Sequence, residues 1–184
     1  MQEDLCKATA HWLAYRRAAG FGHVSEALLM FPLAECLVAS GYDIKPEADT
    51  TKYGVGTPGL FNYDVVAEKN GSHAILLETK YLKARPNMSR CLIDMLKLAL
   101  PPGGDYQRLL LVAGDAATVE NFSLNPEYDL DDLVKVTSPG QAFGKFLVKF
   151  RSEASHPRRI SVEASRTIVA GEVAAKTFSV GRGV

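Results

Sequence analysis

Three side chains between residues 61 and 83 have the types and the spacing needed to bind a divalent cation beside a phosphate. Asp64 and Glu78 are carboxylates, and Lys80 follows Glu78 by two residues. Mg²⁺ prefers oxygen ligands and keeps several waters, so two carboxylates and a substrate phosphate would suit it. The ion would lower the pKa of a bound water, while the lysine orients that water or stabilises charge on the phosphorus oxygens. These residue types therefore fit hydrolysis of a phosphodiester.

The same residues fall on a predicted β-hairpin. Residues 61–68 and 73–80 have the composition of two strands, and Asn70-Gly71 between them is a strong signal for a tight turn. Because side chains along a strand alternate between its two faces, Glu78 and Lys80 should share one face, about 7 Å apart.

The length of the turn decides whether Asp64 joins them. A two-residue turn would pair Asp64 with Leu77 and send its side chain to the wrong face. We expect instead a three-residue loop at residues 69–71 that ends in a left-handed glycine bulge. This register sets Asp64 opposite Leu76 and diagonal to Glu78, within range of a shared ion.

The elements that must position the hairpin are predicted from apolar spacing and turn residues. We expect helices at residues 4–19, 25–40, 88–100 and 139–152, with a kink at Pro32 in the second. We expect further strands at residues 42–47 and 108–113, and short ones at 160–162, 167–169 and 177–180. A mixed central β-sheet with helices on both faces is the simplest packing for this order, which indicates the α/β class.

Asp64, thirteen intervening residues and then Glu78-x-Lys80 resemble the signature of the PD-(D/E)XK nuclease superfamily. The resemblance covers about residues 23–113 and includes the order of elements: a leading helix, a strand, the hairpin, a helix and a buried strand. Tyr63 stands where the signature has proline, which is a common variation. The resemblance implies a restriction-endonuclease-like fold.

The resemblance also implies roles for individual residues. Asp64 and Glu78 would hold Mg²⁺, for which Mn²⁺ would substitute, and Lys80 would activate the attacking water. Many members carry a glutamate early in the leading helix, and Glu26 fits that position as an accessory contact. Glu35 is the alternative, but it lies nine residues further along, so the two should face opposite sides of one helix and only one can enter the site.

Other charged residues near the motif have two interpretations each. Lys83, Arg85 and Arg90 follow Lys80 closely and would either contact substrate phosphates or line a solvated loop. Glu47 follows the first predicted strand and is either a further carboxylate of the site or, as we favour, a solvated strand end. The later pair Asp94 and Lys97, three residues apart on a predicted helix, is expected to form an ion pair on the surface.

Two further patterns are set aside. Residues 54–59 spell G-x-G-x-x-G, but Pro58 and the strand-like residues after it argue against the helix that a dinucleotide site requires. We interpret this segment as a loop bordering the substrate groove. The four histidines lack metal-binding spacing, and His23, near Glu26, is the best placed of them.

Composition narrows the class of protein. Basic and acidic residues balance at 21 each, which counts against a protein that coats DNA passively and less against an enzyme with a local basic groove. After residue 140, eight basic residues face three acidic ones. The three cysteines lack metal spacing and indicate a reducing compartment. No apolar run is long enough to span a membrane, and the N-terminus does not resemble a signal peptide.

Together these features predict one α/β domain over residues 1–184, with a core at about 23–113 and a basic region at 141–184 to which we assign no role. We expect a cytoplasmic, Mg²⁺-dependent nuclease that acts on nucleic acid, with DNA the favoured substrate and no membrane partner. A homodimer would be one way to cut both strands. The alternative is a non-catalytic module on the same fold that binds nucleic acid or protein.

Overall fold

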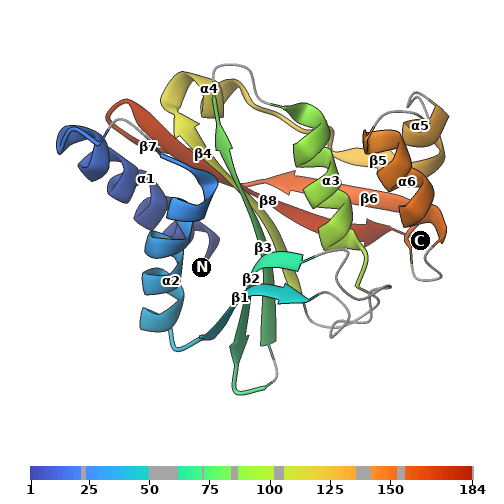
Figure 1. Cartoon of the computed structure of the whole chain (residues 1–184), viewed down its shortest axis with the longest axis horizontal. Helices are drawn as coiled ribbons and strands as arrows, with labels where there is room; N and C mark the ends of the chain where they lie inside the picture. Colours follow the sequence, from blue (N-terminus) through green and yellow to red (C-terminus); the bar gives the residue numbers. More distant parts are fainter. Residues whose placement is uncertain are drawn as a thin grey trace.

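The fold is an eight-stranded mixed β-sheet with helices on both faces, as the composition and element order predict (Figure 1). The computed structural model describes residues 1–21, 24–49, 62–71, 73–83, 87–101, 106–135, 142–152 and 156–183, and structural statements refer to these. The helices are α1 (Gln2–Ala18), the 3₁₀ helix η1 (Glu26–Leu29), α2 (Met30–Ala39), α3 (Met88–Ala99), α4 (Ala116–Asn121), α5 (Leu130–Lys135) and α6 (Ala142–Ser152). The strands are β1 (Asp43–Asp49), β2 (Asn62–Lys69), β3 (His73–Leu82), β4 (Gln107–Asp115), β5 (Glu127–Asp129), β6 (Arg159–Ala164), β7 (Ile168–Ala170) and β8 (Val173–Gly183). No helix in these ranges is both long and apolar enough to cross a bilayer.

The strands follow the order β1-β2-β3-β4-β8-β6-β5, and β7 pairs with β8. The first three strands form an antiparallel meander, after which α3 carries the chain over to β4, which is parallel to β3. Strand β8 from the C-terminal region lies antiparallel to β4. The region that the sequence left without a role thus supplies part of the same sheet.

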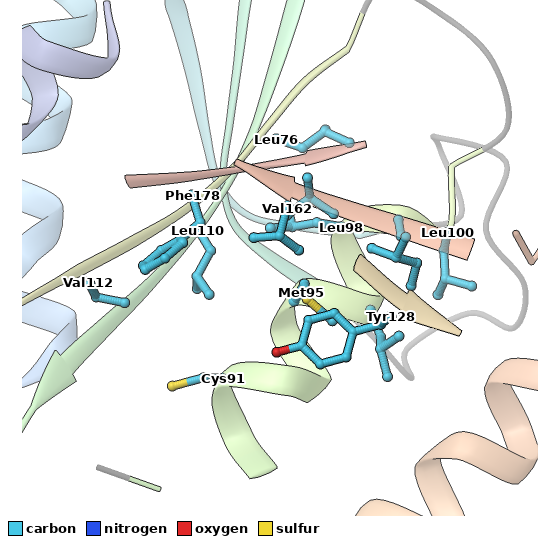
Figure 2. Packing of buried hydrophobic residues seen from close by; sticks show 14 of the residues in the cluster. Leu76, Cys91, Met95, Leu98, Leu100, Leu110, Val112, Tyr128, Val162 and Phe178 are labelled. Carbon is cyan, nitrogen blue, oxygen red and sulfur yellow. The ribbon is translucent and has the colours of Figure 1, made fainter. Parts of the chain in front are cut away.

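Two apolar layers fill the space between the sheet and its helices. One lies under α1 and α2 and includes Leu77 of β3 and Leu111 of β4. The other lies under α3 and α6 and includes Leu76 and Leu110, which Figure 2 shows together with residues of α3. Because strand side chains alternate, Glu78 and Lys80 belong to the same face as Leu76, the face that α3 covers.

The second predicted helix differs from expectation at its start. Instead of one helix kinked at Pro32, the chain forms η1 and then α2, and Pro32 is the third residue of α2. The first four N–H groups of a helix have no partner within it, so the missing N–H of proline breaks no bond here. The predicted kink is therefore wrong, and a junction between two helix types takes its place.

The turn between β2 and β3 also corrects the predicted register. Lys69 pairs with His73, so the turn is centred on Gly71 and lies one residue later than expected. Both Asn70, with φ of +53°, and Gly71, with φ of +67°, adopt the left-handed conformation that asparagine and glycine tolerate best. Continuing this register sets Asp64 opposite Glu78, not opposite Leu76.

Candidate functional site

Asp64 lies at an irregularity in β2. Tyr63 packs in the apolar layer under α3, whereas Val65 packs in the layer under α1 and α2. Residues two apart on a regular strand would share a face, so the alternation breaks at Asp64. Its neighbour in β1 is equally irregular, because Glu47 has φ of +48°. The β1–β2 ladder pairs Pro46 with Val65 and Ala48 with Tyr63, so Asp64 and Glu47 lie at the irregular step between these two pairs.

The carboxylate of Asp64 is held by Thr79, the residue after Glu78. Oδ2 of Asp64 accepts a hydrogen bond from the Thr79 N–H at 2.8 Å and another from the Thr79 hydroxyl at 2.8 Å. Backbone pairing between β2 and β3 ends with Val65 and Leu77. Beyond that pair, the side chain of Asp64 accepts the hydrogen bond of the Thr79 N–H. Asp64 therefore reaches the strand that carries Glu78 and Lys80, although its hydrogen bonds go to the residue between them.

Glu78 and Lys80 form ion pairs with two residues of α3. Nζ of Lys97 lies 2.8 Å from Oε1 of Glu78, and Nζ of Lys80 lies 2.6 Å from Oδ2 of Asp94. The other oxygen of Asp94 lies 3.6 Å from Nζ of Lys97. Lys80 also contacts Oε2 of Glu26 at 3.2 Å. The five residues thus make a series of alternating sign, Glu26, Lys80, Asp94, Lys97 and Glu78, which we call the charge chain.

Two members of the charge chain overturn an expectation. Asp94 and Lys97 were predicted to form an exposed pair, but their residues are only 7% and 9% exposed. Asp94 lies three residues after Cys91 and four before Leu98, both of which Figure 2 shows among the buried side chains under α3. A carboxylate inside an apolar stripe was the signal in the sequence that pointed to burial.

Burial dominates the electrostatics of Glu78, which is 1% exposed. Desolvation raises the pKa of its carboxyl well above the ordinary value, the nearby charges of Asp64 and Asp94 add to the rise, and Lys97 opposes it. With all groups ionised, the four carboxylates of Glu26, Asp64, Glu78 and Asp94 face two ammonium groups. The cluster then carries excess negative charge.

The two lysines keep their protons in this surrounding. Burial alone would lower the pKa of Lys80, but the Asp94 and Glu26 carboxylates outweigh it and raise that pKa above its ordinary value. The pKa of Lys97 behaves in the same way, with burial opposed and outweighed by Glu78 and Asp94. Both side chains are therefore cations at neutral pH.

One end of the charge chain opens into a pocket of about 490 Å³. Glu26 and Lys80 line it together with Lys83 and Arg90, two of the residues predicted to contact phosphates. Arg85 lies outside the described residues, as do His23 and the glycine-rich segment 54–59. The pocket joins the end of β3 to the start of α3 and to η1.

The structure separates the two candidate helical glutamates. Glu26 contacts Lys80 from η1, whereas Glu35 is exposed on α2. Glu47 is exposed on β1, as its interpretation as a solvated strand end requires. The preference for Glu26 over Glu35 thus agrees with the geometry.

The oxygen ligands in the cluster are of the type that a magnesium ion uses. In the described ranges, no three His, Cys, Asp or Glu side chains are grouped to hold a metal ion. Mg²⁺, however, commonly uses one or two carboxylates and completes its shell with water and substrate phosphate. Glu78 and Asp64 are the two carboxylates that could serve, because the charge of Asp64 acts on the buried Glu78 carboxyl and helps to raise its pKa.

Comparison of the chain with protein-family models, curated proteins and solved structures finds no match. The fold and the site together define an α/β protein with a mixed sheet and a largely buried acidic and basic cluster at the end of β3.

Proposed function

We propose that the chain is a Mg²⁺-dependent nuclease with a restriction-endonuclease-like fold, and that DNA is its favoured substrate. The observation that carries the proposal is the contact between Lys80 and Glu26 at 3.2 Å, across 54 positions of sequence. The family resemblance assigned these two residues to one site, and their contact is what that assignment requires. The meander of β1, β2 and β3 followed by α3 and β4 supports the same superfamily.

Asp64 and Glu78 are the residues that would hold the ion. When bound, the ion would supply a water of lowered pKa and neutralise charge that develops on the phosphate. Thr79 would keep the Asp64 carboxylate in a defined orientation through its two hydrogen bonds. Such bonds to a ligand carboxylate are part of what tunes a metal site.

Lys80 would act as a cation and not as a base. Its pKa is raised, so the ammonium persists at neutral pH and can donate hydrogen bonds to a water or a phosphate oxygen. Glu26 and Asp94 would position it from two sides. Lys83 and Arg90 are exposed along the adjoining pocket and would contact phosphates that flank the cleaved bond.

A cleavage assay tests the proposal directly. Supercoiled plasmid, linear duplex, single-stranded DNA and RNA are incubated with the protein in Mg²⁺ or in EDTA. We expect cleavage only with Mg²⁺, and a loss of about 100-fold or more for Lys80→Met, the scale typical of one electrostatic group. Lys7→Met is the matched control, because Lys7 forms an exposed ion pair with Glu3 at 2.7 Å. Cleavage of none of the four substrates, or full activity of Lys80→Met, would contradict the proposal.

A non-catalytic module on the same fold is the second candidate. It is favoured by the charge chain, in which each lysine already pairs with a carboxylate, so that Glu78 has a positive partner without a metal. Calorimetric titration with Mn²⁺ separates the two functions. A nuclease should bind Mn²⁺ and lose that binding in Asp64→Asn, whereas a module that has lost its site should give flat titrations for both.

A further inference from the structure

Lys97 bridges three parts of the site from its position on α3. Its Nζ lies 2.8 Å from Oε1 of Glu78 on β3 and donates a hydrogen bond of 2.8 Å to the carbonyl of Asn62 on β2. Asp94 Oδ1 lies 3.6 Å away on the same helix. The proposed nuclease mechanism gives this ammonium no task, although it is among the most buried cations of the described chain.

The ammonium of Lys97 contacts Oε1 of Glu78, one of the two oxygens that this proposed metal ligand can offer. Glu78 is 1% exposed, so a buried Oε1 already in contact with Nζ has little room for another cation. An ionised carboxylate in this position also needs a positive partner, because an unpaired buried charge is strongly destabilising. Any divalent ion that binds Oε1 must therefore displace Lys97 or share the oxygen with it.

We propose that Lys97 is the built-in counter-ion of Glu78 in the metal-free protein and that it competes with the divalent cation for this carboxylate. The inference rests on the proposed function of the site. It assigns Lys97 to control of metal binding, whereas Lys80 acts on substrate.

Asp94 can accept the ammonium of Lys97 when a metal ion displaces it from Glu78. Nζ of Lys97 is already 3.6 Å from Oδ1 of Asp94, so a small shift exchanges one carboxylate partner for the other. The second oxygen of Asp94 stays on Lys80 at 2.6 Å. The displaced ammonium thus keeps a negative partner, and neither lysine is left as an unpaired buried charge.

Calorimetric titration with MnCl₂ tests the competition without measuring activity. Lys97→Met removes the competing charge at similar volume, and Lys97→Gln removes it but keeps a hydrogen-bond donor. We expect both variants to bind Mn²⁺ about tenfold more tightly or better, a change of about 1.4 kcal/mol. Lys7→Met, which breaks an exposed lysine–glutamate pair, should bind like wild type. The gain should persist at high salt, because screening acts weakly on buried pairs.

Thermal unfolding gives a second readout. Without metal, Lys97→Met should melt below wild type, because Glu78 loses its partner. Mn²⁺ should then raise its melting temperature by more than it raises that of wild type, since tighter binding to the native state stabilises it further.

Each other outcome overturns the inference in a distinguishable way. Folded Lys97 variants with unchanged or weaker Mn²⁺ affinity would refute competition, while cleavage by wild type would leave the nuclease proposal standing. Lys97 variants that stay unfolded even in saturating Mn²⁺ would show that the ion cannot replace the Lys97 ammonium. That result would also refute the competition. If wild type and all variants bind no Mn²⁺, both the competition and the proposed nuclease are wrong.

Discussion

The ammonium of Lys80 on β3 lies 2.6 Å from a carboxylate oxygen of Asp94 on α3. Asp94 reaches the second lysine, Lys97, through its other oxygen at 3.6 Å. The buried carboxylate of Asp94 therefore connects Lys80 to Lys97 within the charge chain. It also couples α3 to β3, the strand that bears Glu78 and Lys80.

The central place of Asp94 predicts a large loss of stability when its charge is removed. Asp94→Asn should lower the free energy of unfolding by about 3 kcal/mol, because Lys80 and Lys97, both largely buried, each lose one of two carboxylate partners. Urea denaturation monitored by circular dichroism measures the change. Asp131→Asn is the control, since Asp131 pairs with Arg151 at 3.0 Å but is 67% exposed, and it should change stability by less than about 1 kcal/mol. Equal effects of the two substitutions would contradict the role of Asp94.

The contact between Glu26 and Lys80 predicts an effect on catalysis and little on stability. Glu26→Gln should slow Mg²⁺-dependent cleavage by about tenfold or more, the loss typical of a residue that orients a group at a metal site. Its side chain is 43% exposed, so we expect unfolding to change little. The comparison is Glu35→Gln, at an exposed position of α2, which should leave the cleavage rate unchanged. Equal cleavage rates for the two variants would show that Glu26 has no role in cleavage.

The hydrogen bonds between Thr79 and Asp64 predict a change that depends on one hydroxyl group. Thr79→Val keeps the backbone donor and the volume but removes the hydroxyl donor to Oδ2. Stability should fall by about 2 kcal/mol, as for other hydrogen bonds to charged groups, and cleavage should slow because Asp64 is less well oriented.

Thr177→Val is the matched control for this prediction. Thr177 is also buried, and its hydroxyl donates to Oε1 of Gln2 on α1, away from Asp64. We expect its loss to lower stability without slowing cleavage per folded molecule. Slower cleavage by Thr177→Val than by Thr79→Val would indicate that the effect on rate is not local to Asp64.

Cys91 lines the pocket beside Lys80 and offers a test of burial at that position. Burial raises the pKa of its thiol to about 11. At pH 8 the thiolate fraction is then about one in a thousand, and the thiolate is the reactive form. Alkylation by iodoacetamide, followed by peptide mass spectrometry, should therefore label Cys91 far more slowly than partly buried Cys36. In urea the two rates should converge, and faster labelling of Cys91 in the native protein would contradict its burial.

Local patterns were sufficient for most of the elements. Helix α3 was expected at residues 88–100 and spans Met88–Ala99, because Asn87 caps its first turn and proline follows its end. Short α4, β5 and α5 were not expected. Strand β5 has three residues and depends on pairing with β6, a contact that no local pattern describes.

In the β2–β3 hairpin, the local sequence predicted the position of the turn but not the register of the strands. Asn70-Gly71 correctly marked the turn, but the predicted register set Asp64 opposite Leu76, whereas the observed pairing continues from Val65 and Leu77 to Asp64 and Glu78. The centre of the turn lies one residue later than predicted, and both Asn70 and Gly71 adopt positive φ there. Turns of similar length differ little in local energy, so packing of the two strands selects the register.

Residue types and spacing identified Asp64, Glu78, Lys80 and Glu26 as the groups that could act together, because strand and helix periodicity are local properties of the chain. The part played by Asp94 and Lys97 depended on where α3 meets β3, since only that contact removes their charges from water and pairs them with Lys80 and Glu78. Whether a charge is buried is decided by segments distant in sequence, and its energy depends on the partners that the fold supplies.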